Sequence, residues 1–187
     1  MGKVICLINT TPDGFVDSQY VNADAEFHEF VHGLLTETET VAFGRNSFEL
    51  FQQIWPAILL KEGAPEPQVR MARALTDMPK YVFSSELLQT TWANTEIIKT
   101  VDSNMINQFK KVGKKGLLTI GSPGLVASLT KLGLVDEYYF SIQSLIAGGG
   151  KARLFDRTNL EDRQPLKLIG SKQLKSGVII INYQKAG

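Results

Sequence analysis

The chain has 187 residues, of which 43% are hydrophobic, and its formal net charge is +1 at pH 7. This length and apolar content suit one domain with a sizeable core, spanning residues 1–187. The 20 basic residues are balanced by 19 acidic ones, so the concentrated cationic excess of a nucleic-acid surface is absent. No apolar run reaches the roughly 18 to 20 residues that span a bilayer. We therefore expect a cytoplasmic protein that binds a small molecule.

The residue types that most often bind metals are few. Cys6 is the single cysteine and lies in an apolar segment, so we predict a buried core residue with no disulfide and no cysteine-ligated zinc. His28 and His32 have the spacing of metal ligands on a helix, but no glutamate-containing zinc motif surrounds them. We interpret both histidines as structural and predict no metal site.

Strand and helix signals alternate along the chain, which is typical of an α/β domain whose sheet is covered on both faces. A buried strand is expected over residues 4–9 and a helix over 23–35, with Asn22 as its N-cap. The chain ends in an antiparallel hairpin signal, with strands at 166–174 and 178–183 around a Lys-Ser-Gly turn. The remaining predicted elements are strands at 40–43, 80–85, 95–101 and 117–120, helices at 47–54, 69–78 and from about 102, a loop at 62–68, and a helix and long strand within 121–147.

Three predicted strands end in residues that suit anion binding. In an open α/β sheet, ligands sit at the carboxyl ends of the strands, where helix N-termini present unpaired N–H groups. An arginine offers a bidentate fork to phosphate, and small residues allow close approach of the backbone. Each segment alone also fits an ordinary turn or helix start, but together they predict a phosphate-rich cofactor. The residues are Gly44, Arg45 and Ser47 after the second strand, Ser84 and Ser85 after the third, and Gly121, Ser122, Pro123 and Gly124 after the strand at 117–120.

Two glycine patterns bear on the prediction of a phosphate-rich cofactor. The first strand leads to "TTPDGF" instead of G-x-G-x-x-G, which disfavours a standard Rossmann domain. The run Gly148 to Gly150 fits either a loop with positive φ or a second close approach of the backbone, and the sequence leaves both open.

Several ordered segments make the chain resemble the dihydrofolate-reductase-like superfamily. "TTPDGFV" resembles its S-x-D-G segment, "VAFGRNSFE" its G-R-x-T-[YW]-E segment, and "LTIGSPGLVASLTKLGLVDEYYFSIQSLIAGGGKARLF" its G-G-x-x-L to L-F segment. The most similar branch is related to the reductase domain of the riboflavin-biosynthesis deaminase-reductase. This resemblance implies an α/β fold with a mixed, mostly parallel sheet flanked by helices, an antiparallel C-terminal hairpin, and NADPH bound across the strand ends.

The resemblance also assigns roles to the anion-binding segments. Gly44, Arg45 and Ser47 would hold cofactor phosphates, and the segment 121–124 would hold the pyrophosphate. Ser84 and Ser85 would lie near the adenosine 2′-phosphate. Many relatives carry a basic residue next, whereas this chain has Glu86, so NADH stays open as an alternative to NADPH.

Carboxylates are the predicted catalytic groups. Asp13 matches the aspartate of the S-x-D-G segment and, with Thr11, would lie near the nicotinamide and substrate. Glu26 lies four residues before Phe30, like the substrate-facing acid of folate reductases, while helical phase points Asp24 more directly inward. We thus predict Asp13 and Glu26 as catalytic and Asp24 and Phe30 as substrate contacts. The alternatives are a turn for Asp13 and helix N-terminal stabilisation for the two helical acids.

The expected function is NADPH-dependent hydride transfer to a small heterocyclic or imine-like substrate, with pyrimidine or pterin substrates implied by the resemblance. The zinc motifs of the deaminase partner, His-x-Glu and Pro-Cys-x-x-Cys, are absent, which indicates a stand-alone reductase-like domain. A noncatalytic NADP(H)-binding protein of the same fold is the alternative. The apolar segment "GVIIINY" fits either a homodimer contact or ordinary core burial.

Overall fold

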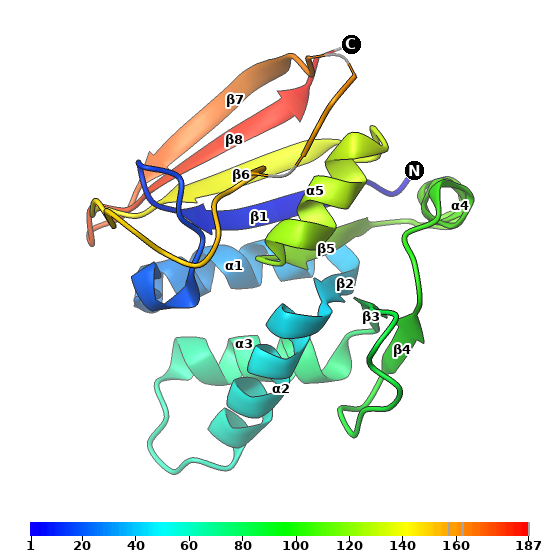
Figure 1. Cartoon of the computed structure of the whole chain (residues 1–187). Coiled ribbons are helices and arrows are strands. Elements are labelled where there is room, and N and C mark those ends of the chain that lie inside the picture. Colours follow the sequence, from blue (N-terminus) through cyan, green and yellow to red (C-terminus); the bar gives the residue numbers. More distant parts are fainter. Residues whose placement is uncertain (157, 162, 187) are drawn as a thin grey trace.

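The computed structural model describes residues 1–156, 158–161 and 163–186, which fold around one eight-stranded sheet. The strand order is β4-β3-β2-β5-β1-β6-β8-β7, in which β8 runs opposite to the other strands and pairs antiparallel with both β6 and β7. Figure 1 shows β3 and β4 at one end of the sheet and β7 and β8 at the other. The predicted mixed, mostly parallel sheet with an antiparallel C-terminal hairpin is confirmed. The strands are β1 Val4–Thr10, β2 Thr38–Gly44, β3 Lys80–Phe83, β4 Thr95–Ile98, β5 Gly116–Ile120, β6 Glu137–Ile142, β7 Leu166–Gln173 and β8 Ile179–Lys185.

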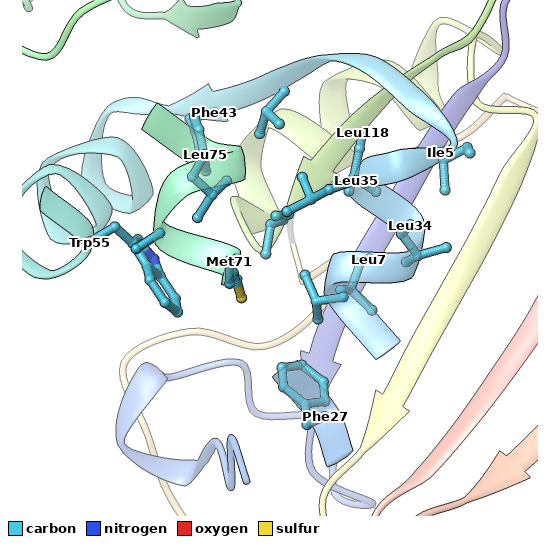
Figure 2. Packing of buried hydrophobic residues seen from close by; sticks show 14 of the residues in the cluster. Ile5, Leu7, Phe27, Leu34, Leu35, Phe43, Trp55, Met71, Leu75 and Leu118 are labelled. Carbon is cyan, nitrogen blue, oxygen red and sulfur yellow. The ribbon is translucent and has the colours of Figure 1, made fainter. Parts of the chain in front are cut away.

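Helices cover both faces of the sheet, because side chains alternate along the buried strands. In β1, Ile5 and Leu7 pack into a cluster with α1, α2 and α3, whereas Cys6 and Ile8 pack into a second cluster with α4 and α5. Figure 2 shows the first cluster, where Leu34 and Leu35 of α1 lie over the sheet. Cys6 is a fully buried core residue, as predicted. The helices are α1 Ala25–Thr36, α2 Arg45–Leu59, α3 Glu66–Asp77, α4 Ser103–Val112 and α5 Pro123–Lys131, with a 3₁₀ turn η1 at Ser18–Tyr20.

Three local predictions are corrected. The N-cap of α1 is Asp24 instead of Asn22, and its Oδ1 accepts the N–H of Phe27 at 2.8 Å. Helix α2 begins at Arg45, directly after β2, and continues through Pro56 to Leu59, well beyond the predicted 47–54. Helix α3 begins at Glu66 inside the predicted loop, because prolines are tolerated in a first turn where their missing N–H is not needed.

The apolar C-terminal segment is part of the sheet interior. Strand β8 pairs with β6 on one side and β7 on the other, and Val178 and Ile180 are buried in the first core cluster. Core burial therefore accounts for this segment. The exposed edge on that side is β7, so the homodimer stays a prediction without a contact assigned to β8. Within the described residues, no helix combines the length and apolarity needed to cross a membrane.

A buried lysine closes the C-terminal end of α3. Lys80 is 1% exposed, and its ammonium donates to the carbonyl oxygens of Leu75, Thr76 and Met78 at 2.8, 3.0 and 2.7 Å. It also lies 4.9 Å from the ring centre of Trp92. Burial lowers the pKa of Lys80 to about 8, so the ammonium still predominates at neutral pH. The last carbonyls of a helix carry partial negative charge, which this cation offsets.

Replacing Lys80 by Met should destabilise the fold by roughly 2–4 kcal/mol, because the three carbonyl groups lose a charged donor in a buried setting. The measurement is the free energy of unfolding in urea. Lys111→Met, which changes an exposed lysine in the last turn of α4, is the matched control and should stay within about 0.5 kcal/mol of wild type. Equal stabilities of the two variants would contradict the capping role.

Candidate cofactor and substrate site

Eight of the ten predicted cofactor residues meet at one cavity, because β3, β2 and β5 are neighbours whose carboxyl ends lie at the same edge of the sheet. This cavity, called here the large cavity, has a volume of about 740 Å³. Thr11 is buried outside it and accepts the N–H of Phe15, while Gly121 lies in an adjoining pocket. The predicted residues that line the large cavity are Gly44, Arg45, Ser47, Ser84, Ser85, Ser122, Pro123 and Gly124.

Two serine hydroxyls hold the end of β2 against the start of α5. The N–H of Ser122 donates to Oγ of Ser47 at 3.0 Å, and the N–H of Gly44 donates to Oγ of Ser122 at 2.9 Å. Gly121 and Ser122 both have left-handed backbones, with φ of 67° and 58°, and this sharp turn places Pro123 at the first turn of α5. These contacts fix the N-termini of α2 and α5 beside one another.

The start of each helix offers donors to an anion. The first turns of α2 and α5 have no side-chain N-cap hydrogen bond, and the residues of both turns line the large cavity. The first N–H groups of a helix have no partner within the helix and carry partial positive charge. Two such ends at one cavity wall suit the two phosphates of a diphosphate.

Cations exceed anions around the large cavity. Arg45 lines it and forms an ion pair with Glu86, which itself follows Ser85. Lys99 and Lys131 line it as well, and sequence reasoning missed both. The available signal was that Lys99 directly follows β4, as Ser84 directly follows β3. Among the residues that the structure describes, three cations against one carboxylate give the lining a formal charge of +2.

A second, apolar pocket of about 270 Å³ adjoins the large cavity and shares Ser47, Ser122 and Pro123 with it. No Asp, Glu, Lys or Arg is among the described residues that line it. The polar side chains at its wall come from Asn9, Ser18 and His28 besides the shared serines. The apolar lining comes mainly from three elements: Ile8 of β1, Phe27 of α1, and Leu50, Phe51, Ile54 and Trp55 of α2, joined by Val16, Val21, Ala23, Met71 and Ile120.

His28 is the titratable side chain in the apolar pocket. It is 6% exposed, and its ring lies edge-on to Trp55 with 5.8 Å between the ring centres. Burial lowers the pKa of His28 below its usual 6.5, so the imidazole is mainly neutral at pH 7. A hydrogen bond with the backbone of Asp24 opposes this shift, but its effect is smaller than that of burial. The sequence predicted that His28 is structural. Its position directly after Phe27, on the buried face of the helix, was the missed signal that it lines a pocket.

The predicted helical acid and aromatic contacts lie outside the apolar pocket. Asp24 is occupied as the N-cap of α1. The Oε2 of Glu26 accepts the N–H of Lys175 at 2.9 Å, which ties α1 to the turn between β7 and β8. Phe30 packs against Tyr139, with 5.7 Å between ring centres. Each of these side chains has a visible structural partner, and none lines either cavity.

Asp13 joins two loops at the same edge of the sheet. Its carboxylate accepts the N–H groups of Ala147 and Gly148 at 3.1 and 2.8 Å. A hydrogen bond from the Thr11 hydroxyl, together with these N–H groups, lowers the pKa of Asp13 to about 2. Such a carboxyl is ionised at neutral pH and has no proton to donate. The structure therefore supports Asp13 as a loop anchor, and Gly148 adopts the positive φ of 66° that the sequence left open.

The same two loops share further contacts that the sequence did not indicate. Asp17 accepts the N–H of Lys151 at 2.9 Å, and Tyr20 donates to the carbonyl of Gly149 at 2.6 Å. Arg153 lies 4.5 Å from the ring centre of Phe15. The loop after β1 thus carries residues of the apolar pocket, such as Val16, on a framework held by the loop after β6.

The fold is that of the dihydrofolate-reductase-like superfamily, in the branch of the riboflavin-biosynthesis reductase domains. The chain belongs to the RibD C-terminal domain family, whose model matches residues 3–180. It is 29% identical to uncharacterized protein YyaP of Bacillus subtilis (strain 168), over 99% of this chain and 96% of that one.

Solved structures share the fold. A putative riboflavin biosynthesis protein from Shewanella sp. PV-4 has a TM-score of 0.72 at 18% identity, with 99% of each chain covered. A pyrimidine reductase-like protein from Corynebacterium diphtheriae has a TM-score of 0.66 at 11% identity, covering 100% of this chain and 92% of that one. RibD of Acinetobacter baumannii has a TM-score of 0.69 at 13% identity, with all of this chain matching 59% of that longer one.

Replacing Ser122 by Ala should lower the free energy of unfolding by about 1–3 kcal/mol, because the N–H of Gly44 loses its acceptor in a part-buried position. Urea unfolding measures the change. Ser128→Ala, an exposed serine on the same helix that bonds only within the helix, is the control and should change stability by less than about 0.5 kcal/mol. A Ser122 variant as stable as this control would contradict the role of the hydroxyl as a tie.

Asp13 should make the contact between the two loops pH-dependent. Its folded-state pKa of about 2 lies below the unfolded value of 3.8, so its stabilising contribution is present above pH 3.8 and is lost as the pH falls toward 2. Asp13→Asn should remove this dependence and speed amide exchange at Ala147 and Gly148 already at pH 7. Hydrogen exchange followed by NMR measures both effects, and unchanged exchange in the variant would contradict the anchor role.

Proposed function

We propose that the protein is an NADPH-dependent reductase of a small heterocyclic or imine-like molecule. The observation that carries this proposal is the joining of two unlike cavities at the strand ends. One is large, cationic and bordered by two helix N-termini, and the other is small, uncharged and rich in aromatic side chains. A nicotinamide dinucleotide joins an anionic adenosine diphosphate part to a flat nicotinamide ring, so these two environments match its two ends. Membership of the RibD C-terminal domain family supports the same activity.

The diphosphate would bind where the first turns of α2 and α5 meet, with Arg45 pairing a phosphate oxygen. The adenosine end would lie toward Ser84, Ser85 and Lys99 on the far side of the large cavity. The nicotinamide end would then point past Ser122 toward the apolar pocket. When bound, the cofactor supplies a hydride to the acceptor carbon, and the electron pair of the reduced C=N or C=O bond takes a proton at the heteroatom.

The proposed choice of NADPH over NADH depends on Lys99 of the large cavity. Glu86 disfavours an extra phosphate, and the sequence alone offered no compensating cation beside the two serines. Lys99 lines the same cavity and supplies such a cation. On this basis Lys99→Ala should weaken NADPH binding more than NADH binding.

A specific observation also supports a second candidate, a noncatalytic NADP(H)-binding protein. No carboxylate lines the apolar pocket among the described residues, and Asp13 is held ionised in a loop contact. NADPH oxidation should therefore be measured with dihydrofolate and with 5-amino-6-(5-phosphoribosylamino)uracil, beside direct binding of NADPH by calorimetry. Turnover with either compound supports the reductase. NADPH binding with no oxidation supports the second candidate, and absence of NADPH binding contradicts both.

Replacing Arg45 by Ala should weaken NADPH binding by about 1.5 to 3 kcal/mol, because a charge-assisted contact to phosphate is lost. Calorimetric titration gives the affinity. Arg73→Ala, an exposed arginine on α3 outside both cavities, is the control and should leave the affinity unchanged. Glu86→Gln should act in the opposite direction and tighten NADPH binding, because Arg45 no longer has to leave an ion pair. Equal affinities of the Arg45 variant and wild type would remove this residue from the site.

A further inference from the structure

The apolar pocket restricts what the reductase can reduce. Its volume of about 270 Å³ is at or below the lower end of ligand pockets, which run from roughly 300 to 1,000 Å³. Part of this space faces the shared residues Ser47, Ser122 and Pro123, where the cofactor's ring would enter. The remaining room suits one or two fused rings and leaves none for a sugar phosphate.

The lack of charged side chains in the pocket also disfavours a phosphorylated substrate. A phosphate taken out of water needs a paired cation or several donors, since an unpaired buried charge costs several kcal/mol. No Lys or Arg lines the apolar pocket among the described residues, and His28 is held mainly neutral by burial. Lys99 and Lys131 lie in the large cavity, where the cofactor phosphates would use them.

His28 is the polar group in this pocket best placed to orient a ring. Phe27 and Trp55 fix its imidazole through edge-on contacts with centre separations of 6.4 and 5.8 Å. A neutral imidazole has one N–H donor and one acceptor nitrogen, which point in different directions, so it can pair with one N–H or one C=O group of a cyclic amide or imide. The flat sides of such a ring suit the aromatic walls of the pocket.

We propose that the substrate is a flat, neutral, unphosphorylated nitrogen heterocycle and that His28 is its main hydrogen-bonding partner. This inference rests on the proposed function for the redox step, but ring binding can be measured apart from it. The chain is thereby assigned a different substrate class from a phosphoribosyl-pyrimidine.

The test is calorimetric binding to the protein alone and to the protein saturated with NADP⁺, which prevents turnover. The probes are uracil, 2,4-dioxopteridine, 5-amino-6-(5-phosphoribosylamino)uracil and its dephosphorylated form. We expect the dephosphorylated form to bind at least as tightly as its phosphate ester, and at least one unphosphorylated probe to lose tenfold or more in affinity in His28→Phe. That variant keeps the aromatic packing against Trp55 and removes both polar nitrogens.

The matched control is His32→Phe, on the same helix but outside both cavities, which should change probe affinity less than twofold. His28→Gln keeps a donor and an acceptor and should lose less affinity than His28→Phe. An unchanged circular dichroism spectrum and melting temperature show that each variant is folded.

Three outcomes would overturn the inference: tenfold tighter binding of the phosphate ester, no effect of His28→Phe, or no binding of any probe at millimolar concentration. Failure of the proposed function gives a different result. In that case NADPH does not bind, while the probes still bind to the protein alone and still depend on His28.

Discussion

The site depends on one arrangement, the close approach of the N-termini of α2 and α5 at the ends of neighbouring parallel strands. Parallel pairing of β2 with β5 brings the two strand ends together, and the Ser47 and Ser122 hydroxyls hold them there. Two helix ends of like partial charge repel one another, so this contact is electrostatically unfavourable by itself. An anion placed between them would remove the repulsion, which is why the serine ties and a diphosphate ligand fit the same geometry.

Much of the fold and of the large cavity could be predicted from the sequence, because both depend on local patterns in strand-turn-helix units. Alternating apolar segments gave the strands, and the small residues after each strand marked the cofactor side. The errors occurred where a distant contact decides the outcome. Asn22 and Asp24 are both good N-caps by type. Helix α1 begins at Ala25, so Asp24 occupies the N-cap position, while the backbone N–H of Asn22, two residues earlier, donates to Gln143 from the loop after β6.

The same reason explains why the predicted catalytic acids, Glu26 and Asp13, have structural partners that the sequence did not indicate. The helical phase places Glu26 beside the buried face of α1, but it does not show which other segment of the chain packs against that face. The β7–β8 turn lies there, and its backbone N–H takes the carboxylate. Asp13 likewise has the expected sequence context, yet its partners come from residues more than 130 positions later in the chain. Lys99 and His28 were missed because neither lies in a recognisable motif. Only the tertiary fold brings them to the cavities.

The large cavity is charged and the apolar pocket is not, because different parts of α2 line them. Arg45 stands at the first position of α2 and lines the large cavity, whereas residues one to three turns later on the same helix, from Leu50 to Trp55, line the apolar pocket. One helix thus supplies the cationic end and the aromatic wall about 5 to 10 residues apart, or roughly 8 to 15 Å at 1.5 Å per residue. A flat ring joined to a diphosphate can therefore contact both regions along a single helix. In the proposed complex the Arg45 end binds the diphosphate, so the apolar end needs no charge. A pocket without charged side chains suits the proposed role of the buried His28 as a hydrogen-bonding group.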